Sequence, residues 1–209
     1  MLPVVEALKK QPNCRQLVPA ELWKYFDEPV LISSWYPERD YWVLISALVK
    51  TIDVAAVGGD VWRFFAKFSA QRDIGGRDVK SPADVKLGGS GVYRTFSAVD
   101  SGDPERFLRR VTQLWSQYHD SGRLEVIGAL PSENAVVLRL TGFSIPIEGF
   151  VLLQGYYVEE YGRLVGIEVS SVVTRSTANK DRYCEWKLRL GRTRVTEAYV
   201  ASLEILEIQ

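Results

Sequence analysis

Histidine, cysteine and methionine are scarce in this chain of 209 residues, and their scarcity excludes several kinds of site. The sequence has one histidine, His119, two cysteines, Cys14 and Cys184, and one methionine. A tetrahedral zinc site needs four Cys or His ligands, so zinc is excluded unless carboxylates or a second subunit contribute. A Ser-His-Asp triad would have to use His119, but Asp120 points about 100° away from it on a helix. We therefore predict no metal site, no catalytic residue and no enzymatic activity.

The sequence also lacks an excess of charge of either sign and lacks long apolar runs. Because 26 Lys and Arg residues balance 26 Asp and Glu residues, we expect no nucleic-acid partner. No run approaches the roughly 18 apolar residues of a membrane span, and residues 1–10 lack the apolar core of a secretion signal. We therefore expect a cytoplasmic protein without a transmembrane segment. Two free thiols fit that compartment.

Hydrophobic residues make up 46% of the chain, as in ordinary globular proteins. In the first half, their three- and four-residue spacing predicts helices over about 37–51, 60–71 and 103–121. Asp103 and Pro104 form a strong start for the third helix, with a capping acid followed by proline at the first position. Residues 77–102 are interrupted by glycine and proline, and one short helix after Pro82 stays open there.

In the second half the apolar period changes to that of strands. Residues 124–140 predict a hairpin, Pro146 to Tyr161 a helix closed by Gly162, and 164–190 two further strands. Residues 195–208 fit a terminal helix. The order strand, strand, helix, strand, strand predicts an α+β fold in which N-terminal helices pack on a four-stranded antiparallel sheet. We expect a single domain over 1–209, mainly helical over 1–102 and helix plus sheet over 103–209.

Several polar residues have an ordinary structural explanation. His119 is expected at the C-terminus of a helix, where an imidazolium interacts favourably with the helix dipole. Cys184 is expected inside a strand as a packed residue. Glu159 and Glu160 are adjacent on a helix, so they cannot face each other, and we expect them on a solvated helix edge.

The stretch 175–194 is locally basic, with seven Lys and Arg residues against two acids. Lys187 and Arg189 would share one face of a strand, and such a face could attract phosphates or an acidic partner. Acidic residues further along, Glu197, Glu204 and Glu207, would neutralise it. A solvated face is the preferred interpretation, and the basic sheet surface stays open.

Aromatic residues are abundant, with six Trp, ten Tyr and eight Phe. Many fall on predicted helices that also carry core stripes, so core packing is the preferred explanation. The lining of an apolar pocket or of a subunit interface stays open.

Three segments resemble a superfamily of small-molecule-binding domains: Leu114–Val126, Ile147–Tyr156 and Tyr183–Leu190. This superfamily includes vinyl-reductase-type ligand-binding domains, haem nitric-oxide sensors and vesicle-tethering transport-complex subunits. With Trp35-Tyr36-Pro37 and residues 59–62 included, the whole chain is similar to a myxobacterial paralogous family of comparable length.

The resemblance implies a non-enzymatic sensory or protein-interaction module in bacterial signalling. Such a module would form a homodimer or bind a protein partner, and would hold an apolar small molecule between helices and sheet. The ligand-binding residues predicted in this way are Trp115, Tyr118, His119, Phe150 and Gln154.

The alternative is a haem or gas sensor that uses His119. Two departures from the haem sensors count against it. Trp115 aligns with their proximal histidine, and the sequence lacks their Tyr-x-Ser-x-Arg motif. We therefore predict no cofactor.

Overall fold

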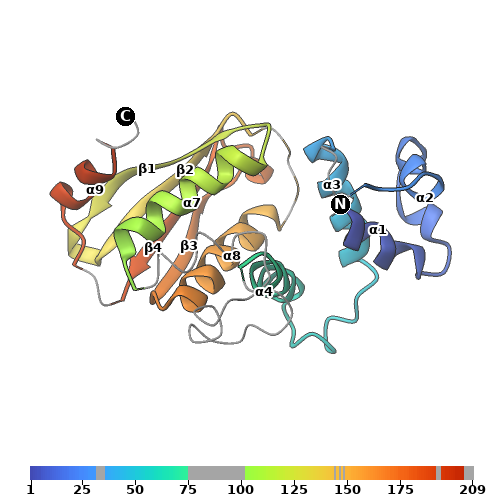
Figure 1. Ribbon diagram of the computed structural model, residues 1–209, viewed down its shortest axis with the longest axis horizontal. Helices are drawn as coiled ribbons and strands as arrows, with labels where there is room; N and C mark the ends of the chain where they lie inside the picture. Colours follow the sequence, from blue (N-terminus) through green and yellow to red (C-terminus); the bar gives the residue numbers. More distant parts are fainter. Residues whose placement is uncertain are drawn as a thin grey trace. The chain divides into compact units, whose positions relative to one another are not determined.

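The structure is a computed structural model that describes residues 1–31, 36–74, 102–143, 145, 147, 149–191 and 194–204. The chain divides into two compact units, Met1–Val61 and Trp62–Gln209, whose elements are labelled in Figure 1. The single domain over 1–209 stays a prediction. The expected elements at 77–101 and 205–208 lie outside the described residues.

The first unit is helical. It contains α1 (Leu2–Lys9), the 3₁₀ turns η1 (Cys14–Leu17) and η2 (Ala20–Leu22), α2 (Lys24–Asp27) and α3 (Glu38–Val49). The helix expected over 37–51 is confirmed, with Pro37 as its N-cap residue. The Tyr25 hydroxyl donates to Asp40 over 2.7 Å. Burial, and then this bond, raise the pKa of Tyr25.

The second unit is built on a four-stranded antiparallel sheet in the order β1-β2-β4-β3. The strands are β1 (Arg123–Leu130), β2 (Ala135–Thr141), β3 (Val169–Arg175) and β4 (Cys184–Leu190). Each hairpin turns through a 3₁₀ segment, η3 (Pro131–Glu133) or η4 (Thr177–Asn179), followed by a left-handed residue, Asn134 or Lys180. The predicted α+β fold with a four-stranded antiparallel sheet, and the predicted order strand, strand, helix, strand, strand along the chain, are therefore confirmed.

The helices of this unit are α4 (Val61–Ile74), α7 (Pro104–Tyr118), α8 (Phe150–Val165) and α9 (Glu197–Glu204). The expected start of α7 is confirmed, because the Asp103 carboxylate accepts from the Glu105 and Arg106 amides at 3.0 and 3.2 Å. In Figure 1, α7 runs along β1 and α8 lies against β3. None of the helices in the described part of the chain is long and apolar enough to cross a membrane.

The limits of α8 correct the sequence prediction. The helix begins after Gly149 and ends at Gly166, both of which have positive φ, at 84° and 80°. Gly162, expected to close the helix, lies within it. A Cβ at this position would overlap the Val169 side chain, so the glycine permits close contact with β3. The strand expected from Leu164 begins at Val169, since Leu164 is fully buried in the last turn of α8. The helix expected to reach about 121 ends at Tyr118.

The two faces of the sheet differ in chemistry. Side chains of the inner face, toward α7 and α8, are apolar and buried, and include Leu138, Leu140, Trp186 and Leu188. The Trp186 indole donates to the Val151 carbonyl of α8 over 2.7 Å, which ties the sheet to that helix. The alternate positions of β2 and β4 form the outer face, and most of them are polar.

Candidate functional site

The interior between α7, α8 and the sheet contains two of the five predicted ligand-binding residues. Trp115 of α7 and Gln154 of α8 line a void there, together with residues that include Leu138 and Trp186. The void has a volume of about 10 Å³. A void of this size has room for about one water molecule, whereas small-molecule sites measure roughly 300 to 1,000 Å³. This part of the interior is therefore filled by side chains.

An aromatic cluster brings Trp115 together with Phe150 and His119. Phe150 stacks on Phe143 with 4.3 Å between ring centres, and Trp115 presents its edge to both rings. His119 is the C-cap residue of α7, and its ring lies parallel to that of Trp115 at 3.7 Å. The side chain of Tyr118 lies outside the described residues. Ring packing accounts for these positions, and their role in ligand binding stays a prediction.

A much larger hollow lies outside the core, between α4, the start of α7, α8 and the start of β3. We call it the groove, and its volume is about 850 Å³. This volume is in the range of small-molecule sites. Three cations and three carboxylates line it: Arg63, Lys67, Arg163, Glu159, Glu160 and Glu168.

Two of these carboxylates correct the sequence prediction. Glu159 accepts from the amide and hydroxyl of Ser171 at 2.7 and 2.9 Å, and from Arg63 at 3.0 Å. Glu160 accepts from Arg163 at 2.8 and 2.6 Å and from Gln71 at 3.2 Å. Their side chains are 16% and 11% exposed, so the predicted solvated edge was wrong.

The physical reason is that α8 has a neighbour on this side as well. Glu159 meets the edge strand β3 and pairs with Arg63 of α4, while Glu160 bonds to Gln71 of α4. The hydrogen bonds to Glu160 raise the pKa of Arg163. Both carboxylates are therefore compensated within the protein.

Lys67 differs from Arg63 and Arg163, the other cations of the groove, because it is not paired with a carboxylate in the described part of the chain. It lies four residues after Arg63, so the two share a face of α4. Among the described residues, no hydrogen bond or ion pair involves the Lys67 side chain. The Arg63 guanidinium lies 4.0 Å from the centre of the Tyr156 ring, and Ile167 and Val169 add apolar surface to the lining. The groove thus joins an available cation to an aromatic and aliphatic wall.

Sequence reasoning missed this groove. Its walls come from residues 63–67, 102–104 and 156–169, which are far apart in the chain. The four-residue spacing of Arg63 and Lys67 was the signal present in the sequence. In the ranges that the structure describes, no group of three His, Cys, Asp or Glu side chains is placed to hold a metal ion.

No family model and no curated protein matches the chain. Solved structures do match it. An H-NOX protein from S. oneidensis in the Fe(II)NO ligation state aligns with a TM-score of 0.50 and 10% identity, over 91% of this chain and 97% of that chain. An H-NOX structure from a study of heme distortion gives a TM-score of 0.48, 12% identity and coverages of 93% and 94%. A trafficking protein particle complex subunit 3 from Naegleria fowleri, covalently bound to palmitic acid, aligns with a TM-score of 0.48 and 10% identity, over 75% of this chain and 93% of that chain.

The first of these likenesses shows an H-NOX-like fold. At 10% identity this likeness shows the fold alone, and no comparison supports the narrower myxobacterial family.

Haem does not fit the described interior of this fold. The void beside Trp115 holds about 10 Å³. His119 ends α7 with its ring flat on Trp115. A porphyrin would need a pocket of roughly 300 Å³ or more. The residues between α7, α8 and the sheet therefore leave no room for a porphyrin.

Proposed function

We propose that the chain is a non-enzymatic sensory or protein-interaction module that binds its small molecule in the groove and not in its core. The difference in volume carries this proposal, because the interior void measures about 10 Å³ and the groove about 850 Å³. The H-NOX-like fold supports it as an architecture and does not identify the ligand.

The lining of the groove defines the class of ligand. Lys67 offers an ammonium group with three donors, which suits a carboxylate or a phosphate. Tyr156, Ile167 and Val169 suit an apolar body attached to that group. The ligand we propose is therefore an anionic molecule with an apolar body, which retains part of the apolar ligand predicted from the resemblance.

The experiment compares two anions with their neutral counterparts. We expect phenyl phosphate and hexanoate to bind the full chain in isothermal titration calorimetry, and phenol and hexanol to bind much more weakly. In Lys67→Glu the affinity for both anions should fall by about tenfold or more, because a charge-assisted bond is replaced by repulsion.

Arg110→Glu is the matched control, since it makes the same change of charge elsewhere in this unit. Arg110 lies on α7 and does not line the groove. Its affinity should stay that of the wild type. Equal losses in both variants, or no binding of either anion, would refute the groove as the site.

The haem alternative has its own test. A colourless protein after incubation with haem agrees with the proposal. A Soret band that is lost in His119→Ala would instead show that the alternative is correct. Homodimer formation, a role in bacterial signalling and membership of the myxobacterial family are retained as parts of the proposal, and they rest on the resemblance. A cytoplasmic location is also retained, and it rests on the sequence of residues 1–10 and on the two free thiols.

A further inference from the structure

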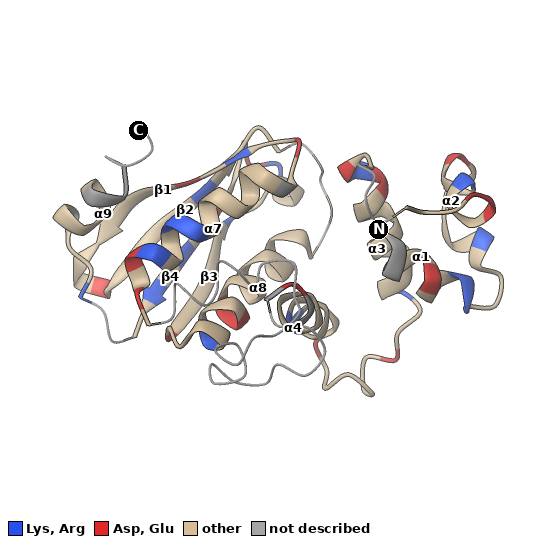
Figure 2. Cartoon of the chain, in the orientation of Figure 1, with Lys and Arg blue, Asp and Glu red and all other residues tan. Residues whose placement is uncertain are grey.

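The outer face of the sheet and the hairpin that joins β3 to β4 carry an excess of positive charge. Along β2, β4, the end of β3 and the two hairpin turns, six cations outnumber three carboxylates, although the whole chain is neutral. On β1, Arg123 and Glu125 of the same face form an ion pair at 2.9 Å and leave this excess unchanged. Figure 2 shows Lys and Arg positions on both strands. The cations are Arg139, Arg175, Lys180, Arg182, Lys187 and Arg189, and the carboxylates are Glu133, Asp181 and Glu185.

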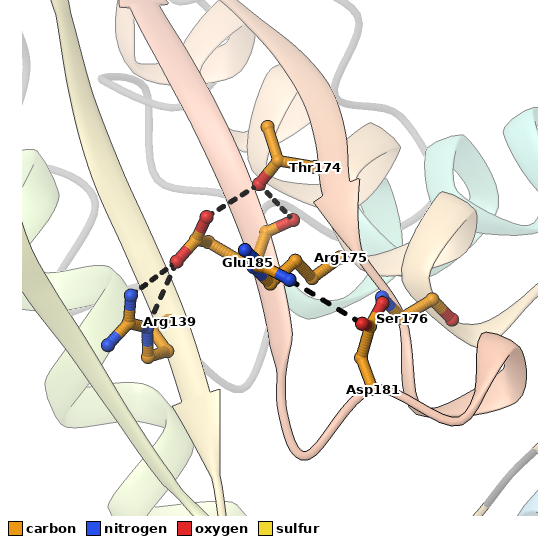
Figure 3. Close-up of polar contacts among 6 residues, drawn as sticks. All are labelled: Arg139, Thr174, Arg175, Ser176, Asp181 and Glu185. Carbon is orange, nitrogen blue, oxygen red and sulfur yellow. Dashed lines mark hydrogen bonds and ion pairs between the residues drawn. The ribbon is translucent and has the colours of Figure 1, made fainter.

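Each carboxylate of this face is already engaged. Glu185 accepts from Arg139 at 3.0 and 2.7 Å and from the Thr174 hydroxyl at 2.9 Å (Figure 3). Asp181 lies 3.6 Å from Arg175 and accepts from the Ser176 amide at 2.9 Å.

The third carboxylate, Glu133, is shared by Lys187 and Arg189. It therefore compensates one of these two charges. The acids expected to neutralise this face were Glu197, Glu204 and Glu207, whose side chains lie outside the described residues.

The hairpin adds two further cations. Lys180 and Arg182 are exposed, and within the described ranges neither forms an ion pair. The backbone of Lys180 has a φ of 67° at the end of η4, which places this residue at the turn. The positive excess is therefore concentrated at the hairpin and not spread evenly over the sheet.

The arginines of this face are held in place before any partner binds. The Tyr183 ring has the Arg139 guanidinium at 4.2 Å and that of Arg175 at 5.6 Å. Each of the two also pairs with a carboxylate. A guanidinium has five N–H donors, so donors remain after these bonds. Because these arginine side chains are already ordered, they would lose less conformational entropy when a partner binds.

We propose that the outer face and the β3–β4 hairpin bind a protein partner whose contact surface is rich in Asp and Glu. Val172, which is 47% exposed opposite Lys187, gives this face an apolar contact among the charges. Acidic side chains fit better than a nucleic acid. The pI near 6.6 is far below that of typical nucleic-acid-binding domains. The inference does not depend on a ligand in the groove.

A fluorescein-labelled poly-L-glutamate peptide is the probe, and fluorescence anisotropy of the full chain is the measurement. We expect binding at low ionic strength that weakens as salt is added. The double variant Lys180→Glu/Arg182→Glu should raise the Kd by about tenfold or more. Circular dichroism would check that the double variant is folded.

The matched control is Lys9→Glu/Lys10→Glu, which reverses two exposed charges of the first unit that belong neither to the outer face nor to the lining of the groove. Its Kd should stay within about twofold of the wild type. The proposal is overturned if the wild type does not bind the peptide, if salt has no effect, or if the control loses as much affinity. Tighter binding of a DNA duplex of equal charge through Lys180 and Arg182 would also overturn it.

Discussion

The two sides of α8 face different surroundings. Toward the sheet, the Val151 carbonyl accepts a hydrogen bond from the Trp186 indole N–H, and Gln154 and Val158 line a void of about 10 Å³. Toward α4, Glu159 and Glu160 are paired with arginines beside a groove of about 850 Å³. Both sides are ordered, but only the second leaves room for a ligand. The comparison teaches that, in the described part of this chain, space for a small molecule lies outside the core between helix and sheet.

The side of α8 that faces the sheet should tolerate the truncation of a buried side chain least. Trp186 is 2% exposed and is bonded to α8, so Trp186→Ala should lower the free energy of unfolding by about 3–5 kcal/mol. Urea unfolding followed by circular dichroism measures this. Phe68→Ala, at a side chain that is 50% exposed, should cost only about 0.5 kcal/mol. Similar losses in both variants would show that the interior is not packed as described.

The next largest loss of stability is expected where α8 and β3 approach each other closely. A Cβ at Gly155 would lie 2.7 Å from the Ser171 hydroxyl, so Gly155→Ala should destabilise the protein by about 2 kcal/mol. At Gly128 a Cβ would meet nothing within 4 Å, and Gly128→Ala should be neutral or slightly stabilising. Thermal unfolding of the two variants measures this difference. An unchanged thermal midpoint in Gly155→Ala would refute the close contact.

The charged side should lose less on mutation. Glu159→Ala leaves the Ser171 amide without its acceptor and removes the ion pair with Arg63, which should cost about 1 kcal/mol. A double-mutant cycle with Ser171→Ala isolates the hydroxyl bond. A coupling near zero would mean that the hydroxyl bond adds nothing and that Glu159 acts through the Ser171 amide and Arg63.

The smallest effect belongs to Glu133, an exposed carboxylate. Hydrogen bonds from Lys187, and then from Arg189, lower the pKa of Glu133 below its usual range. A lowered pKa stabilises the fold above the ordinary glutamate pKa, and this contribution is lost as the pH falls through the folded value. Thermal midpoints of the wild type should therefore exceed those of Glu133→Gln slightly at neutral pH and converge in acid. A constant difference across this range would contradict the assignment.

Local signals predicted much of this architecture. Asp103 and Pro104 fixed the start of α7, and the alternation around Leu138 and Trp186 gave two strands of the sheet. The predicted C-terminal limit of α8 was wrong because Gly162 was interpreted as the end of the helix. Instead, the absence of a Cβ at Gly162 allows close contact with Val169. Whether a glycine ends a helix or admits a neighbour depends on tertiary structure, which the local sequence does not contain.

The groove could not be predicted for a similar reason. Its charged residues pair across elements that are distant in sequence, as Arg63 does with Glu159. The same limit applied to Lys187 and Arg189, whose shared face was predicted but whose partner Glu133 was not. The role of Trp115, His119 and Gln154 as ligand-binding residues stays a prediction.

The most direct test of the account is a two-dimensional NMR titration of the labelled chain with phenyl phosphate. The account predicts shifts of the Ile167 and Val169 backbone amides in the groove, while the indole N–H signals of Trp115 and Trp186 stay in place. Shifts of those two indoles without shifts in the groove would place the ligand in the core and contradict the account.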